Sequence, residues 1–88
     1  MRHLKKASKD IIWSFAVQLN RPIKHIGYEK NDVSISNQKT DGGYFELIIN
    51  GTEYYPTTKR EVYEILREVD STFTDWWESC NEHYFEEK

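Results

Sequence analysis

The chain has 88 residues with a formal net charge of -3, and 31% of its residues are charged while 38% are hydrophobic. This length predicts one domain covering residues 1–88, and the composition favours a folded chain over a disordered one. Cys80 is the only cysteine, which excludes an intrachain disulfide framework and favours a cytoplasmic setting. The longest apolar runs are three residues and no apolar stretch follows the N-terminal charges, so we expect neither a membrane span nor a signal peptide.

The first segment predicts a helix over residues 5–19, ended by Asn20, Arg21 and Pro22 because the residue before proline disfavours the helical conformation. Its apolar residues recur at helical spacing: Leu4, Ile11, Ile12, Phe15, Ala16 and Leu19. The basic residues Arg2, Lys5, Lys6 and Lys9 gather around this helix. Residues 22–31 predict only a short extended piece.

Three strands follow, over residues 33–36, 44–49 and 52–56. Asn50-Gly51 is a strong signal for a two-residue hairpin turn, which pairs Leu47 with Tyr54 and Ile49 with Thr52. A three-residue loop at 41–43 places Ile35 opposite Ile49.

The alternation of side chains assigns two faces to this sheet. The face expected to lie under the helices carries Ile35, Phe45, Leu47, Ile49 and Tyr54. The opposite face carries Tyr44, Glu46, Ile48, Glu53 and Tyr55.

Two helical pieces are predicted at the end, over about 59–70 and 72–85, with a break near 71–74 and fraying of residues 86–88. Thr58 and Glu61 form a capping box that begins the first piece. An apolar stripe at helical spacing is expected to be buried, with Cys80 as its last member: Val62, Ile65, Leu66, Val69, Phe73, Trp76 and Cys80. The predicted fold is therefore α+β, in the order helix, three-stranded antiparallel sheet, helix.

Charge is distributed unevenly along the chain. Residues 1–30 hold seven Lys or Arg against two acids, whereas residues 61–88 hold nine acids against two bases. Such an asymmetry indicates an interaction surface. The alternative is that the basic and acidic helices lie side by side and neutralise each other, so that the acids only keep the domain soluble.

The acids of the last third recur every three to four residues, which aligns them along exposed helix sides. Tyrosine and tryptophan among them are suited to anchor an interface. We therefore predict a non-enzymatic protein-binding module whose partner has a basic surface, such as a nucleic-acid-processing enzyme. The candidate contact residues are Glu61, Glu64, Glu68, Asp70, Asp75, Trp77, Glu78, Glu82 and Tyr84.

Residues with catalytic or metal-binding chemistry are sparse. His3, His25 and His83 lie in different predicted elements and in no recognisable motif. Cys80 and His83 supply two metal ligands where a structural zinc needs four. We therefore predict no enzyme activity, no metal and no cofactor.

The size, the acidity and the hairpin leading into a Glu-, Tyr- and Trp-rich end (residues 54–87) resemble small phage-encoded inhibitors of the anti-CRISPR type. That resemblance implies an inhibitor that occupies the nucleic-acid-binding site of a host protein.

The element order also resembles the double-stranded-RNA-binding domain, including Lys59 and Arg60 at the start of the last helix. The chain lacks that family's Gly-Pro-x-His loop, and its last helix is acidic. This resemblance implies a first alternative, nucleic-acid binding through the basic N-terminal helix. A second alternative is a homodimeric structural or assembly protein that pairs through Tyr44, Ile48 and Tyr55.

Overall fold

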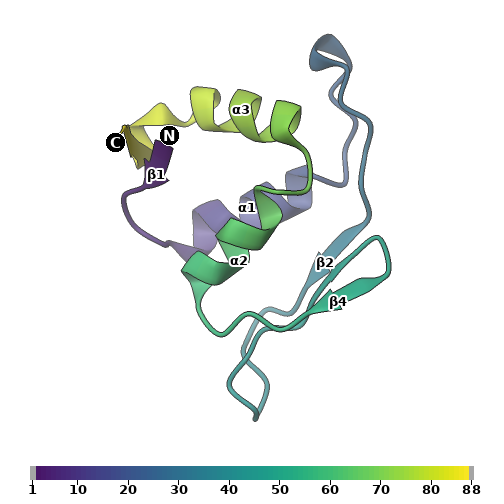
Figure 1. The fold of residues 1–88 in the computed structure, drawn as a ribbon, viewed down its shortest axis with the longest axis vertical. Helices are drawn as coiled ribbons and strands as arrows, with labels where there is room; N and C mark the ends of the chain where they lie inside the picture. The colour runs from purple at the N-terminus through teal and green to yellow at the C-terminus, as the bar shows by residue number, and fades with distance from the viewer. Residues whose placement is uncertain (1, 88) are drawn as a thin grey trace.

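In a computed structural model that describes residues 2–87, three helices pack together beside a small three-stranded sheet (Figure 1). The strands are β1 (Arg2–Leu4), β2 (Val33–Ile35), β3 (Leu47–Ile49), β4 (Thr52–Tyr54) and β5 (Phe85–Glu87). The helices are α1 (Lys9–Gln18), α2 (Lys59–Leu66) and α3 (Ser71–Cys80), with short 3-10 turns η1 (Lys24–Ile26) and η2 (Glu82–Tyr84). The predicted α+β class and the antiparallel sheet β2-β3-β4 are confirmed.

The two ends of the chain form a second, two-stranded sheet that the sequence did not predict. β1 pairs antiparallel with β5, and Leu4 lies opposite Phe85 with both side chains buried. Figure 1 shows the two termini side by side. The prediction that residues 86 and 87 fray is therefore wrong, and Lys88 lies outside the described residues.

The first helix begins four residues later than predicted. Residues 2–4 are taken up by β1, so α1 starts at Lys9 after a short turn. Of the predicted basic residues, Arg2, Lys5 and Lys6 lie before the helix, and the only charged residues within α1 are Lys9 and Asp10. The prediction of a basic first helix is therefore wrong.

The hairpin between β3 and β4 has the predicted register. Leu47 pairs with Tyr54 and Ile49 with Thr52. Asn50 and Gly51 have φ angles of 50° and 86°, as a two-residue primed turn requires.

The predicted pairing of Ile35 with Ile49 is wrong, because Ile35 lies opposite Leu47 and Val33 opposite Ile49. The connection from β2 to β3 is a long loop, closed by a hydrogen bond from Ser36 N to Glu46 O (2.9 Å). A register shift of two residues keeps every side chain on its predicted face.

The core lies between the helices and the inner face of the sheet. Phe15 of α1 is at its centre, with ring centroids of Tyr63, Phe73 and Trp77 at 5.3, 5.2 and 4.7 Å. From the sheet, Phe45, Leu47 and Ile49 are buried and Ile35 is partly buried. Tyr54, predicted for this core, is 36% exposed because β4 is an edge strand.

The break between the last two helices lies at residues 67–70, slightly before the predicted position. Asp70 accepts a hydrogen bond from Phe73 N (2.9 Å) and so caps the start of α3. The predicted cap of α2 is confirmed, since Thr58 Oγ1 accepts from Glu61 N at 3.1 Å. α3 ends at Cys80, and the prediction that the helix continues to residue 85 is wrong because Phe85 turns back into the core as part of β5.

Within residues 2–87, none of the helices has both the length and the apolar character needed to cross a bilayer.

Candidate protein-binding surface

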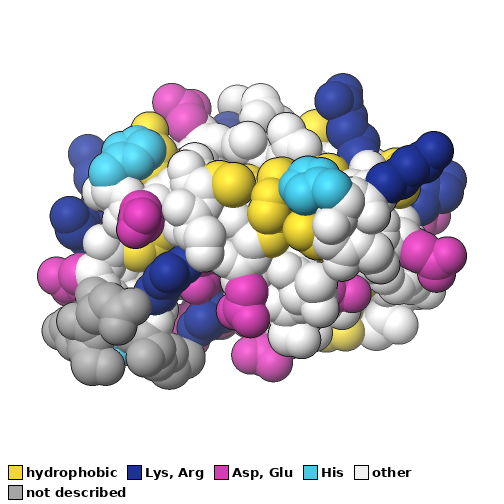
Figure 2. All heavy atoms as spheres, turned by 90° about the horizontal axis from the view of Figure 1, so that it is seen from above, with side chains coloured by type: hydrophobic (Ala, Val, Ile, Leu, Met, Phe, Trp, Pro, Cys, Tyr) yellow, Lys and Arg dark blue, Asp and Glu magenta, His cyan; other side chains and the backbone are white. Residues whose placement is uncertain are grey.

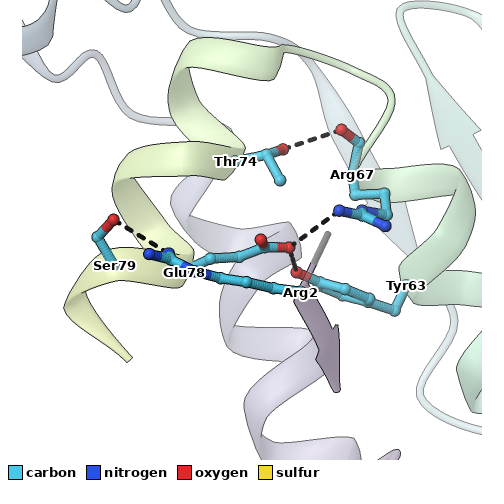
Figure 3. A network of polar contacts seen from close by, with 6 residues as sticks. All are labelled: Arg2, Tyr63, Arg67, Thr74, Glu78 and Ser79. Carbon is cyan, nitrogen blue, oxygen red and sulfur yellow. Dashed lines mark hydrogen bonds and ion pairs between the residues drawn. The ribbon is translucent and has the colours of Figure 1, made fainter. Parts of the chain in front are cut away.

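Glu78, one of the predicted contact residues, is inside the protein. Only 3% of it is exposed. Its carboxylate accepts a hydrogen bond from the Tyr63 hydroxyl (Oε2 to Oη, 2.5 Å) and lies 3.5 Å from Arg67 Nη2 (Figure 3). A buried carboxylate needs such partners, because desolvation of an unpaired charge is costly. The prediction that Glu78 belongs to an exposed acidic row is therefore wrong.

The cause is a rotation of α3 relative to the predicted orientation. The buried residues of α3 are Phe73, Thr74, Trp77 and Glu78, whereas the sequence pattern predicted a stripe through Phe73, Trp76 and Cys80. Trp77 is 4% exposed and Cys80 is exposed. Both predictions, Trp77 as an interface anchor and Cys80 as a core residue, are wrong.

Further polar contacts tie β1, α2 and α3 together around Glu78 (Figure 3). Thr74 Oγ1 donates to the carbonyl of Arg67 (2.9 Å), which joins the start of α3 to the end of α2. Arg2 Nη1 donates to Ser79 Oγ at 3.1 Å, which joins β1 to α3. The network thus fixes which side of α3 faces the core.

The remaining predicted contact residues are mostly at the surface. Asp70 is half-buried, and its side chain caps α3. Tyr84 is 42% exposed. The exposed acids are Glu61, Glu64, Glu68, Asp75 and Glu82. Their role in binding stays a prediction.

Basic side chains are interleaved with the acids of α2, whereas α3 contains no Lys or Arg. Within α2 itself, Lys59 and Arg60 balance Glu61 and Glu64. Figure 2, which looks down on the molecule from above, shows Lys and Arg dispersed among Asp and Glu, with no field of one sign.

The alternative that the basic and acidic segments neutralise each other is not seen at Lys5, Lys9 and Arg21, whereas Arg2 of β1 does contact α3 through Ser79. Among the described side chains, Lys5, Lys9 and Arg21 have no ion pair with the acids that follow residue 60. Lys9 Nζ instead donates to the carbonyl of Asn37 and lies 5.6 Å from the centroid of the Trp13 ring.

A different part of the surface gathers exposed aromatic and apolar residues. Within the described residues, the large hydrophobic side chains that are at least 36% exposed are Val17, Ile48, Tyr54, Tyr55 and Tyr84. Ile48 and Tyr54 lie in the hairpin β3–β4, and Tyr55 directly follows β4. We call the outer face of this hairpin the hairpin surface, and it consists of Tyr44, Glu46, Ile48, Glu53 and Tyr55.

The hairpin surface is organised by contacts of its own. The Tyr44 and Tyr55 rings meet edge to face, with centroids 5.1 Å apart. The Tyr55 hydroxyl donates to Glu53 Oε1 (2.9 Å), and this hydrogen bond to the carboxylate raises the pKa of Tyr55. Strand alternation predicts which residues share this face, whereas the charge pattern predicted an acidic contact on the helices.

Metal chemistry has no visible basis in the described part of the chain. Among residues 2–87, no three His, Cys, Asp or Glu side chains are grouped so that they could hold a metal ion.

Comparison of the chain with protein-family models, with curated proteins and with solved structures finds no match. The resemblances to phage-encoded inhibitors and to double-stranded-RNA-binding domains stay predictions. Any function must be argued from the geometry of the chain itself.

Substitution Tyr63→Phe is expected to lower the free energy of unfolding by about 2 kcal/mol, because it removes the hydroxyl that donates to the buried Glu78 carboxylate. Urea denaturation measures the change. The control is Tyr84→Phe at an exposed position, which should change stability by less than about 0.5 kcal/mol. Equal losses in the two variants would contradict the assigned role of Tyr63.

Stability should also depend on pH through Tyr63. Burial, followed by the hydrogen bond to Glu78, raises the pKa of its hydroxyl above the ordinary value of 10.0. Above about pH 10 the unfolded chain releases this proton while the folded chain keeps it, so the stabilisation is complete below that pH and declines above it.

The stability advantage of the wild type over Tyr63→Phe should therefore shrink as the pH rises past about 10. Tyr28, whose pKa burial also raises, is present in both proteins and cancels in the comparison. Denaturation curves at a series of pH values test this, and an advantage that stays constant would contradict it.

Proposed function

We propose that the chain is a non-enzymatic protein-binding module and that its hairpin surface binds a basic surface of another protein. One observation carries the proposal. Two of the most exposed large apolar side chains among the described residues, Ile48 and Tyr55, lie on the hairpin surface with the partly exposed Tyr44, beside the exposed acids Glu46 and Glu53.

The residue types fit such a role. Tyrosine supplies much of the binding energy at protein interfaces, because its ring buries a large area and its hydroxyl still forms hydrogen bonds. Exposing these side chains to water is unfavourable, so a patch of them indicates a surface that is covered in a complex.

The two carboxylates define the sign of the partner. Glu46 and Glu53 lie on the same face as Ile48 and Tyr55, since their positions alternate along neighbouring strands. Carboxylates at the border of an apolar patch favour Lys and Arg on the opposing protein and repel acidic surfaces. The partner class is the one that the sequence predicted, including a basic nucleic-acid-binding site, but the contact moves from the helices to the hairpin.

Nucleic-acid binding through the first helix receives less support. Lys9 is the only basic residue in α1, and its ammonium group is engaged by the carbonyl of Asn37. Neutralising several phosphates requires several free cations along one element.

Charge reversal on two surfaces tests the proposal. Tagged wild-type protein, the double variant Glu46→Lys/Glu53→Lys and the matched control Asp75→Lys/Glu82→Lys are used to capture proteins from an extract of the encoding organism. All four positions are exposed, so the variants should stay folded. We expect a set of basic proteins that binds the wild type and the control at low salt, is released by high salt and is lost from the hairpin variant.

Loss of that set from Asp75→Lys/Glu82→Lys alone would return the contact to the helices. Its retention on the hairpin variant would refute the assignment of the hairpin surface.

A further inference from the structure

The two edges of the three-stranded sheet differ in how their backbone groups are satisfied. The strand order is β2-β3-β4, so β2 and β4 are the edges. In an antiparallel ladder every second residue of an edge strand directs its N–H and C=O away from the neighbouring strand. Those groups need water, side chains or another strand as partners.

The outer edge of β2 is covered by side chains of the first helical segment. Asn20 Oδ1 accepts from Val33 N and Asn20 Nδ2 donates to Val33 O, both at 2.9 Å. Trp13 Nε1 donates to the carbonyl of Ser36 at 3.2 Å. This edge cannot receive a further strand along its full length without displacing those contacts.

Among the described side chains, none bonds to the backbone at the outer edge of β4. After a two-residue turn, the hydrogen-bonded pairs of this hairpin are Ile49–Thr52 and Leu47–Tyr54. The hydrogen bond from Phe45 N to Pro56 O (2.8 Å) continues this set of pairs. The N–H and C=O groups of Glu53 and Tyr55 therefore point away from β3. Every residue of β4 is exposed, and in the described chain β3 is the only strand hydrogen-bonded to it.

We propose that the β4 edge receives an extended, basic segment of the partner protein as a fourth strand of the sheet. This inference rests on the proposed function and specifies its binding mode. Backbone hydrogen bonds to Glu53 and Tyr55 hold the segment, and its side chains determine which sequence is accepted.

The side chains of β4 define the chemistry of the segment. On the outer face, the residue beside Glu53 and Tyr55 is Lys or Arg, because the carboxylate attracts it and the tyrosine ring accepts a cation on its face. On the opposite face, the next residue is apolar, because it lies beside Tyr54, which is 36% exposed. The segment therefore alternates basic and apolar residues.

A second copy of this chain is a poorer occupant of the same edge. Antiparallel pairing of two β4 strands brings Glu53 of both copies close together, and like charges on neighbouring strands are unfavourable. Although Pro56 lacks an N–H, it leaves the edge open to an added strand, because its backbone faces β3 and its carbonyl accepts from Phe45 N. Glu53 thus disfavours self-association and favours a basic strand.

The probe is a capped heptapeptide of alternating lysine and valine, titrated into the isotope-labelled full chain. NMR should show the largest amide shifts at Glu53 and Tyr55, with Val33 on the covered edge unaffected. A peptide with glutamate in place of lysine should not bind. Shifts centred on β2 or on the helices, or no binding of the lysine peptide, would overturn the proposal.

Two substitutions at one position separate the backbone from the charge. Glu53→Ala keeps the outward N–H and removes only the carboxylate, so affinity should fall about fivefold or less. Glu53→Pro also removes the N–H that faces away from β3, and affinity should fall by about another factor of ten. Equal affinities of the two variants would overturn the proposal.

Proline at this position removes no ladder hydrogen bond, so thermal unfolding of the two variants should agree. If Glu53→Pro does not fold, amide exchange of the wild type replaces it, and the peptide should slow exchange at Glu53 and Tyr55. Slowing at these amides that depends on protein concentration without peptide would assign the edge to a second copy and overturn the proposal.

The strand binding mode and the proposed function are distinguished by different outcomes. If Glu46→Lys/Glu53→Lys loses its captured proteins but Glu53→Pro and Glu53→Ala capture equally, the surface is right and the strand mode is wrong. If charge reversal on the hairpin has no effect, the proposed function itself is wrong.

Discussion

The arrangement of the domain depends on α1, because this one helix contacts two different parts of the structure. Ile12, Phe15 and Leu19 are fully buried in the core, where Phe15 meets the aromatic rings of α2 and α3. The other side of the same segment binds the edge of β2 through Trp13 and Asn20. Packing the core therefore also closes one edge of the sheet and leaves β4 as the open one.

Charge along the sequence and charge at the surface are different quantities in this protein. Glu78 counts toward the acidic last third, yet its carboxylate is held inside by Tyr63 and Arg67. Lys59 and Arg60 fall among the acids of α2. The face seen from above is mixed in sign (Figure 2), whereas the hairpin surface joins the exposed acids Glu46 and Glu53 to the exposed Tyr55. The proposed contact therefore rests on acids beside apolar surface rather than on the number of acids along the chain.

Sequence reasoning succeeded where structure is set by neighbours in the chain. The Asn50-Gly51 turn defines the pairing of Leu47 with Tyr54, and Thr58 caps α2 through a residue three positions away. The two faces of the sheet were also predictable, because alternation does not depend on the exact register.

It failed where distant segments decide the outcome. The pairing of β1 with β5 joins the two ends of the chain, and no local sequence pattern predicts it. The rotation of α3 depends on the hydroxyl of Tyr63 in α2 and the guanidinium of Arg67 just after α2, which make burial of Glu78 acceptable. Alternation predicted the hairpin surface as a sheet face, but the burial of Trp77 and Glu78 depends on contacts that the sequence does not show.

Amide hydrogen exchange of the free protein tests most directly whether the sheet has one closed and one open edge. The account predicts slow exchange for Val33, whose N–H is bound by Asn20, and for Tyr54, which pairs with Leu47. It predicts fast exchange, close to that of an unstructured peptide, for Glu53 and Tyr55. Glu53 and Tyr55 amides that exchange as slowly as Val33 would show that the β4 edge is already occupied and would contradict the account.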